Sequence, residues 1–196
     1  MIGHKLTHGV TQFTAALDYH DESGALNEHL SDVFGVLVKQ FTLKQSTAKA
    51  DWLLGAELLA KSVHGVAVRS MKAPGTAYDD PILGKDPQPS HMRGYVHGDD
   101  DSGGVHVNSG IPNHAFYLAA IALGGNAWET AGRIWYLALT RKLRHTAQFQ
   151  DCADATWNAA GELFGAGSEP QDAVAAAWKG VGVSRSPTVK SNNRLR

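Results

Sequence analysis

The segment between about Ser23 and Thr42 constrains the fold most strongly, because apolar residues recur in it every three or four positions. They form one stripe, namely Leu26, Leu30, Val33, Phe34 and Leu37. Such spacing places the side chains on one face of an α-helix, and that face must be buried against other elements. The segment from Met1 to about Tyr19 has the same spacing, and Asp21 and Gly24 mark a turn between the two predicted helices.

The rest of the chain divides into an irregular region and a second helical region. From about residue 65 to 110 prolines and glycines are frequent and the periodicity disappears, which predicts a long, functional loop. Further helices are predicted at about 112–123, 127–144, 149–164 and 170–179, and no alternating strand pattern of useful length occurs. We therefore expect a mainly α fold, a helical bundle with a long irregular loop. The polar, basic end of the chain, residues 184–196, is predicted to be disordered.

Composition argues against several classes of partner. The 196 residues carry a formal net charge of -1, so no long-range field attracts nucleic acid or an anionic membrane. The single cysteine, Cys152, excludes an intrachain disulfide and a four-thiolate metal site, and its helical segment predicts a core position. The sequence has neither an apolar run of 18 residues nor a signal-peptide pattern. We expect no nucleic-acid or membrane partner, and a cytoplasmic location for the chain as written unless it is a fragment.

Histidines and carboxylates at helical spacing predict a metal site. His4 and His8 are four residues apart, so both rings can reach one ion from the same helix face. This pair alone is weak evidence for a metal site, because a chain with 10 histidines contains about 0.5 such pairs by chance. Glu28 and Asp32 share a face of the next helix in the same way, and a hairpin would bring that face to the histidines.

Two imidazoles and the Glu28 carboxylate would give zinc three ligands and leave a fourth position for water, as in catalytic sites. Asp32 and Asn27 suit hydrogen bonds to the histidine rings that fix their tautomers and orientation. Lys5 departs from this chemistry. It occupies the position where the helix of a zinc peptidase carries the glutamate that activates water.

The segment GHKLTHGVTQFTAALDYHDESGALNEHLSDVFG resembles the zinc-binding helix hairpin of the thermolysin-like neutral metalloendopeptidases. A second segment, DDSGGVHVNSGIPNHAFYLA, is similar to the part of that family that stabilises the developing oxyanion. The resemblance extends to about Val183 and implies the family's carboxyl-terminal helical lobe as one domain, residues 1–183. It also implies one zinc ion, bound by His4, His8 and Glu28, and a peptide or protein substrate.

The resemblance assigns further roles. It implies that His106 stabilises the oxyanion, that Asp101 orients His106, and that Tyr19 also faces the oxyanion. Arg69 matches the arginine that binds the substrate carbonyl. Lys5 stands in place of the family's general base, so a cation replaces the group that accepts a proton. Weak or absent catalysis is the expected result.

Two features of the family are expected to be lost. Lys39, Leu53 and Ala56 stand where calcium-rich members carry acidic ligands, which leaves Asp51 alone, and too few oxygens remain for a calcium cluster. The β-rich amino-terminal lobe that closes the cleft in such enzymes is absent from this chain. We expect the open face to promote self-association. The family implies secretion, in contrast to the location expected from the chain as written.

Two functions remain open. The first is a zinc metalloendopeptidase, present as a truncated chain with impaired or absent catalysis. The second is a non-catalytic pseudopeptidase, which would be a zinc- or peptide-binding module or a degenerate fragment. The family pattern favours the first function, whereas Lys5 and the missing lobe favour the second.

Overall fold

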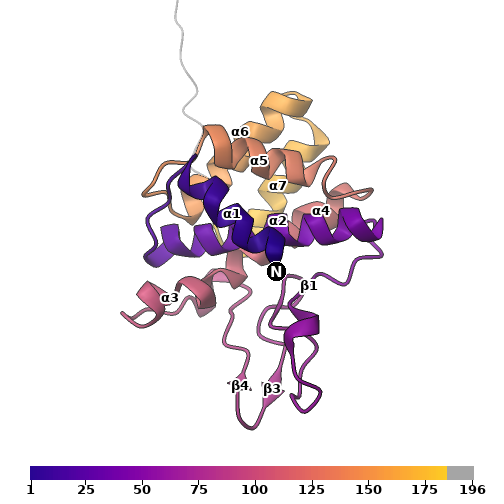
Figure 1. Ribbon diagram of the computed structural model, residues 1–196. Helices are drawn as coiled ribbons and strands as arrows, with labels where there is room; N and C mark the ends of the chain where they lie inside the picture. Colours follow the sequence, from indigo (N-terminus) through magenta and orange to yellow (C-terminus); the bar gives the residue numbers. More distant parts are fainter. Residues whose placement is uncertain (185–196) are drawn as a thin grey trace, which may run out of the picture.

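The computed structural model describes residues 1–184 and is mainly helical, which confirms the expected fold class. The predicted disordered tail lies outside the described residues except for Ser184. In Figure 1, α2 crosses the middle of the molecule with α1 against it, and the irregular segment lies on the side opposite α5 and α6. The helices are α1 (Ile2–Gln12), α2 (Asp21–Leu43), α3 (Asp101–Asn108), α4 (Gly110–Leu123), α5 (Ala131–Arg141), α6 (Phe149–Phe164) and α7 (Glu169–Gly180).

The apolar stripe of α2 forms the centre of the core, and its fully buried members are Leu26, Leu30 and Val33. The first turn of the helix is acidic, which suits the positive end of the helix dipole. In that turn Glu22 Oε2 accepts a hydrogen bond of 2.7 Å from the backbone N–H of Phe149, which ties the start of α2 to the start of α6. No helix within residues 1–184 combines the length and the hydropathy needed to cross a membrane.

The carboxyl-terminal helices pack an aromatic core against α2. The apolar, helical context of Trp128, Trp135, Trp157 and Trp178 predicts core positions, and Trp135 and Trp178 are fully buried. Their rings stack with centroids 6.5 Å apart at an interplanar angle of 8°. Trp128 and Trp157 are partly buried against the same core. Cys152 is buried as predicted, and burial raises the pKa of its thiol well above the usual value.

A long irregular segment, residues 44–100, joins α2 to α3. It contains the 3-10 turns η1 (Ala56–Leu58) and η2 (Met92–Gly94) and two antiparallel ladders, β1 (Leu53–Leu54) with β2 (Arg69–Ser70) and β3 (Asp79–Asp80) with β4 (Gly84–Lys85). Two carboxylates order its backbone by accepting N–H bonds. Asp80 accepts from His64, Ile82 and Leu83, and Asp86 accepts from Gly75, Ala77 and Gln88. Backbone donors without a helix or sheet partner are thereby satisfied.

The end of the first predicted helix is wrong. The pattern extends to about Tyr19, but α1 ends at Gln12. The chain then turns, with Ala16 in the left-handed region at φ 50°, and this turn lets Tyr19 reach back to α2. Periodicity did not reveal the turn, because Ala15 and Leu17 are buried within it and continue the apolar pattern.

The bounds of the predicted loop are also wrong. The irregular segment begins at residue 44 rather than about 65, and α3 lies inside the predicted range. Asp101, Ser102, Gly103 and Gly104 all have positive φ, between 53° and 82°, so α3 begins with a left-handed turn. Runs of left-handed residues are rare, because each side chain there is strained. A Cβ on Gly103 would lie 2.2 Å from Asp21 Oδ1, so glycine is required for this contact with the start of α2.

Candidate metal centre

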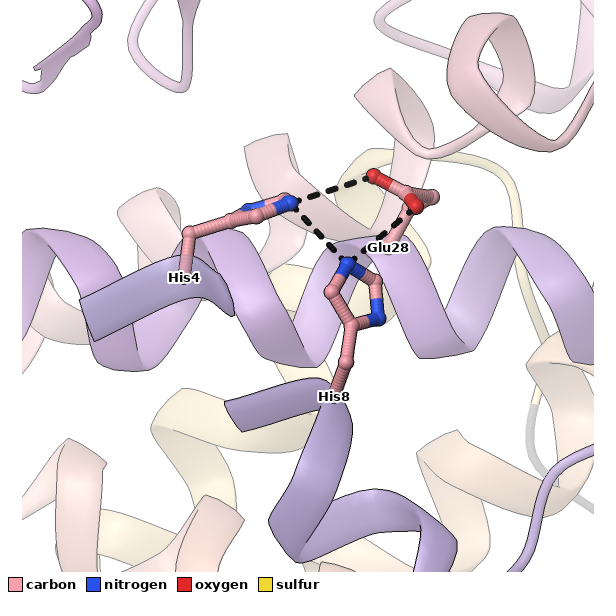
Figure 2. Close-up of side chains that lie close together, drawn as sticks. All are labelled: His4, His8 and Glu28. Carbon is pink, nitrogen blue, oxygen red and sulfur yellow. Dashed lines mark hydrogen bonds and ion pairs between the residues drawn. The ribbon is translucent and has the colours of Figure 1, made fainter. Parts of the chain in front are cut away.

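His4, His8 and Glu28 converge where α1 packs against α2. The two histidines lie one turn apart on α1, and Glu28 comes from the first half of α2. Figure 2 shows both imidazoles pointing at the Glu28 carboxylate. His4 Nε2 lies 3.6 Å from Oε2, and His8 Nε2 lies 3.5 Å from Oε1. The three ligand atoms all lie within 4.8 Å of one another, a spacing that can hold one metal ion.

Hydrogen bonds behind the two rings leave lone pairs facing this centre. His4 Nδ1 lies 2.8 Å from Asp32 Oδ1. His8 Nδ1 lies 2.8 Å from Asn27 Oδ1. Both partners are acceptors, so in each neutral ring Nδ1 carries the proton and Nε2 presents a lone pair, an assignment that follows from the network. The two Nε2 atoms are 3.1 Å apart, which is close for two acceptors.

This set of groups fits zinc. Glu28 is buried, and its Oε2 has no hydrogen-bond partner within residues 1–184. With the proton on Nδ1 in both rings, three lone-pair atoms converge here, an arrangement that a bound cation would stabilise. Two imidazoles and one carboxylate match the ligands of catalytic zinc sites, whereas calcium prefers a cage of oxygens. The bonds from the ring Nδ1 atoms to Asp32 and Asn27 are of the kind that orients histidine ligands.

Asp32 connects the buried polar groups behind His4. Its side chain is fully buried, and besides the His4 bond it accepts a bond of 2.9 Å from Asn113 Nδ2. Burial by itself would raise the pKa of Asp32, but the Arg69 guanidinium and His4 outweigh it and lower the pKa to about 2. Asp32 is therefore ionised at neutral pH and polarises the His4 ring toward the centre.

Arg69 lies beside the centre and faces its carboxylates. The β1–β2 ladder places it by pairing it with Leu54. The side chain is 11% exposed, and one terminal nitrogen lies 2.8 Å from Asp32 Oδ1 and 4.0 Å from Glu28 Oε2. Its Nε is buried and has no partner within the described part of the chain. The guanidinium thus acts as counter-ion to two buried acids, and its predicted contact with a substrate carbonyl stays a prediction.

His106 and Tyr19 lie on the other side of Glu28. His106 Nδ1 lies 2.6 Å from Asp101 Oδ1, and Asp101 Oδ2 accepts the backbone N–H of His106 at 2.8 Å. His106 Nε2 lies 3.4 Å from Glu28 Oε1 and 3.2 Å from the Tyr19 hydroxyl. The Tyr19 hydroxyl donates to Glu28 Oε1. Burial and Glu28 raise the pKa of Tyr19, so this hydroxyl keeps its proton.

Lys5 follows His4 on α1 and is exposed. Its side chain forms no hydrogen bond or ion pair with any residue in the described range 1–184. A protonated lysine amine has three donors and no acceptor, so it offers nothing that takes a proton from water. The geometry therefore leaves the centre without a carboxylate base at this position.

Three buried side chains that support the site were not predicted from the sequence. Asn113 donates to Asp32 and lies 2.8 Å from His29 Nδ1. Burial lowers the pKa of His29 to about 4, against opposing effects of Asn113 and Asp32. Gln88 Nε2 donates at 2.7 Å to the backbone carbonyl of His106 and so fixes that residue from the irregular segment. For His29 and Asn113 the only signal in the sequence was a polar residue within an apolar helix pattern, which does not identify its partner, and Gln88 in the irregular segment gave no signal.

Comparisons with known proteins identify the family of this chain. The family described as "Thermolysin metallopeptidase, alpha-helical domain" matches residues 15–183. The chain is 57% identical over 184 residues to the "Extracellular metalloprotease" of Pectobacterium carotovorum subsp. carotovorum, covering 93% of this chain and 52% of the relative. It is 53% identical over 192 residues to "Protease PrtS" of a Photorhabdus species, covering 93% of this chain and 50% of the relative.

A solved structure is similar as well. The precursor of protealysin, a metalloproteinase from Serratia proteamaculans, superposes with a TM-score of 0.91 at 57% sequence identity, covering 93% of this chain and 56% of that one. The chain therefore spans about half the length of the curated relatives it matches. With the family match and these identities, the chain belongs to the thermolysin metallopeptidase family, of which it forms the α-helical domain.

Proposed function

We propose that this chain is the helical half of a zinc metalloendopeptidase and that its own catalysis is impaired. The observation that carries the proposal is the convergence of His4 Nε2, His8 Nε2 and the buried Glu28 carboxylate, whose ligand atoms lie within 4.8 Å of one another. Membership of the family supports a peptide or protein substrate. The name of the Pectobacterium relative supports a secreted location.

The residues around the centre suit hydrolysis of a peptide bond. A zinc ion bound there would supply Lewis-acid polarisation of the peptide carbonyl and of a water molecule. Tyr19, and His106 in the form that carries a proton on Nε2 as well as on Nδ1, would donate hydrogen bonds to the carbonyl oxygen as negative charge develops on it. Asp101 keeps the His106 ring turned so that Nε2 faces the centre. The raised pKa of Tyr19 keeps its hydroxyl available as a donor.

We propose impaired catalysis because Lys5 stands in place of the family's general base. Loss of a general base typically slows an enzyme by about 10²- to 10⁴-fold. The half of the relatives that these residues do not match would also contribute to positioning a substrate, so residues 1–196 tested by themselves should react more slowly still. A second candidate, a non-catalytic zinc- or peptide-binding module, is favoured by the same exposed Lys5, because the centre can hold zinc and a ligand without a base.

We also propose that the chain associates through the outer face of α1. Apolar side chains on this face are exposed, with Ile2 at 80%, Leu6 at 68% and Phe13 at 91%. In a longer protein the half that precedes this domain would cover such a surface. Light scattering over a concentration series should show a mass that rises above that of one chain, because contiguous apolar surface promotes association. Leu6→Gln with Phe13→Gln should reduce the rise, and a constant single-chain mass for the unmodified protein would argue against this surface.

Zinc binding is predicted at one ion per chain. After loading with zinc and desalting, the unmodified protein should retain about one equivalent, measured by elemental analysis, because three ligands are already gathered. His8→Ala should lose most of the metal. His145→Ala is the matched control, since that histidine is exposed and pairs with Asp18 outside the centre. Equal zinc in all three proteins would remove the proposed site.

Calcium is predicted to stabilise this chain little. Lys39 Nζ lies 2.9 and 2.8 Å from the two Asp51 carboxylate oxygens and 3.3 Å from the Leu53 carbonyl, so an ammonium group already uses these oxygens. A ligand stabilises only through preferential binding to the folded state. Thermal melts with millimolar calcium, millimolar magnesium or a chelator should give the same midpoint. A rise of many degrees specific to calcium would show that oxygen ligands remain.

Proteolysis by the unmodified, zinc-loaded chain is predicted to be very slow or absent. Lys5→Glu alone should restore little in residues 1–196 tested by themselves, because the half of the relatives that they do not match would also position the substrate. Lys5→Glu joined to the amino-terminal half of a relative should restore cleavage of casein that a chelator abolishes. The same fusion with Lys5→Gln is the control and should stay at least about 10²-fold slower. Rapid, chelator-sensitive cleavage by the unmodified chain would contradict the proposed impairment.

A further inference from the structure

A chain of buried hydrogen bonds runs from the aromatic core to His4. Trp135 Nε1 donates to His29 Nε2 at 2.8 Å. His29 Nδ1 lies 2.8 Å from Asn113 Oδ1, and Asn113 Nδ2 donates to Asp32 Oδ2 at 2.9 Å. Asp32 Oδ1 in turn accepts from His4 Nδ1 at 2.8 Å. None of the five residues is more than 2% exposed, so water does not compete for these bonds.

The donor and acceptor of every hydrogen bond in this series follow from the bond that Trp135 makes at its inner end. An indole nitrogen can only donate, so His29 Nε2 must accept and His29 Nδ1 must carry the proton. That proton requires an acceptor, which orients the Asn113 amide with its oxygen toward His29 and its NH₂ toward Asp32. The carboxylate of Asp32 is then held from one end by Asn113 and from the other by His4.

We propose that Trp135 and His29 are positioning residues for the zinc site, which set the orientation of the His4 ring through Asn113 and Asp32. The inference rests on the zinc site proposed above. Neither Trp135 nor His29 is a ligand, and both act only through the groups between them and His4. Hydrogen-bond partners of metal-bound histidines commonly tune metal affinity, and these hydrogen bonds extend such support three side chains beyond Asp32, to Asn113, His29 and Trp135.

Loss of the indole donor would change the orientation of the His4 ring through His29, Asn113 and Asp32 in turn. With Trp135→Phe, His29 can adopt the other tautomer, in which Nδ1 accepts. The Asn113 amide would then turn its NH₂ toward His29 and its oxygen toward Asp32, where two acceptors repel each other. Asp32 would shift, and the His4 ring with it.

A second buried indole in the same core provides the matched control. Trp178 stacks on Trp135, and its Nε1 donates to Thr156 Oγ1 at 2.9 Å. Thr156 Oγ1 donates to the backbone carbonyl of Cys152, so this bond ends within α6 and does not lead to the metal centre. Trp178→Phe therefore removes a bond of the same kind from the same core without disturbing Asp32.

The experiment compares the unmodified chain, Trp135→Phe and Trp178→Phe. Zinc dissociation constants are measured by competition with a chelator, and the visible spectra of the cobalt-substituted proteins report ligand geometry. Trp135→Phe should weaken zinc binding about 10-fold and change the cobalt spectrum, whereas Trp178→Phe should change affinity by less than about twofold. If Trp135→Phe does not fold, the double variant His29→Leu with Trp135→Phe replaces both polar groups with apolar ones and should show the same loss.

The outcomes separate this inference from the function on which it rests. Tight zinc binding by the unmodified chain, with equal affinities and spectra for the Trp135 and Trp178 variants, would overturn the positioning role and leave the zinc site intact. Failure of the unmodified chain to bind zinc would overturn both. A loss confined to the Trp135 variant is the result that supports the proposal.

Discussion

The close packing of α1 against α2 determines every distance in the metal centre. A Cβ on Gly35 of α2 would lie 3.3 Å from the Cβ and the backbone nitrogen of His4, and a Cβ on Gly3 would lie 3.3 Å from the Cα of Gly35. The separation of packed helices depends on the side chains at their contact, so these glycines allow an unusually near approach. His4 can therefore reach both the Glu28 carboxylate in front of its ring and Asp32 behind it.

Buried charge makes this packing specific. Glu28 and Asp32 are almost inaccessible to water, and an unpaired buried carboxylate is costly. Asp32 is balanced by Arg69, with His4 and Asn113 filling the remaining positions on its oxygens. The hydrogen bonding of Glu28 is less complete. The Tyr19 hydroxyl donates to one oxygen, and the other oxygen has no hydrogen bond within the described chain. The Glu28 carboxylate faces the two histidine rings, and a cation bound there would offset its buried charge.

The sequence predicted the parts of this arrangement that repeat locally. Spacings of four residues were sufficient for the pairs on α1 and α2, and the resemblance to a family brought in Tyr19, Asp101 and His106, which the structure places around Glu28. The end of α1 was missed because buried Ala15 continues the apolar pattern through a turn. His29 and Asn113 were missed because they are 84 residues apart and only the tertiary fold pairs them.

Under the proposed function, Lys5 separates metal binding from catalysis, since it would leave the three ligands in place and remove only the base. Binding of the metal is thus the property on which both the proposed function and the proposed support from the core depend. X-ray absorption at the zinc edge tests it most directly. We expect two histidine nitrogens at about 2.0–2.1 Å and a carboxylate oxygen at about 2.0–2.2 Å in the unmodified chain, with one histidine lost in His8→Ala. An all-oxygen shell, or a spectrum unchanged in His8→Ala, would contradict a zinc site formed by α1 and α2.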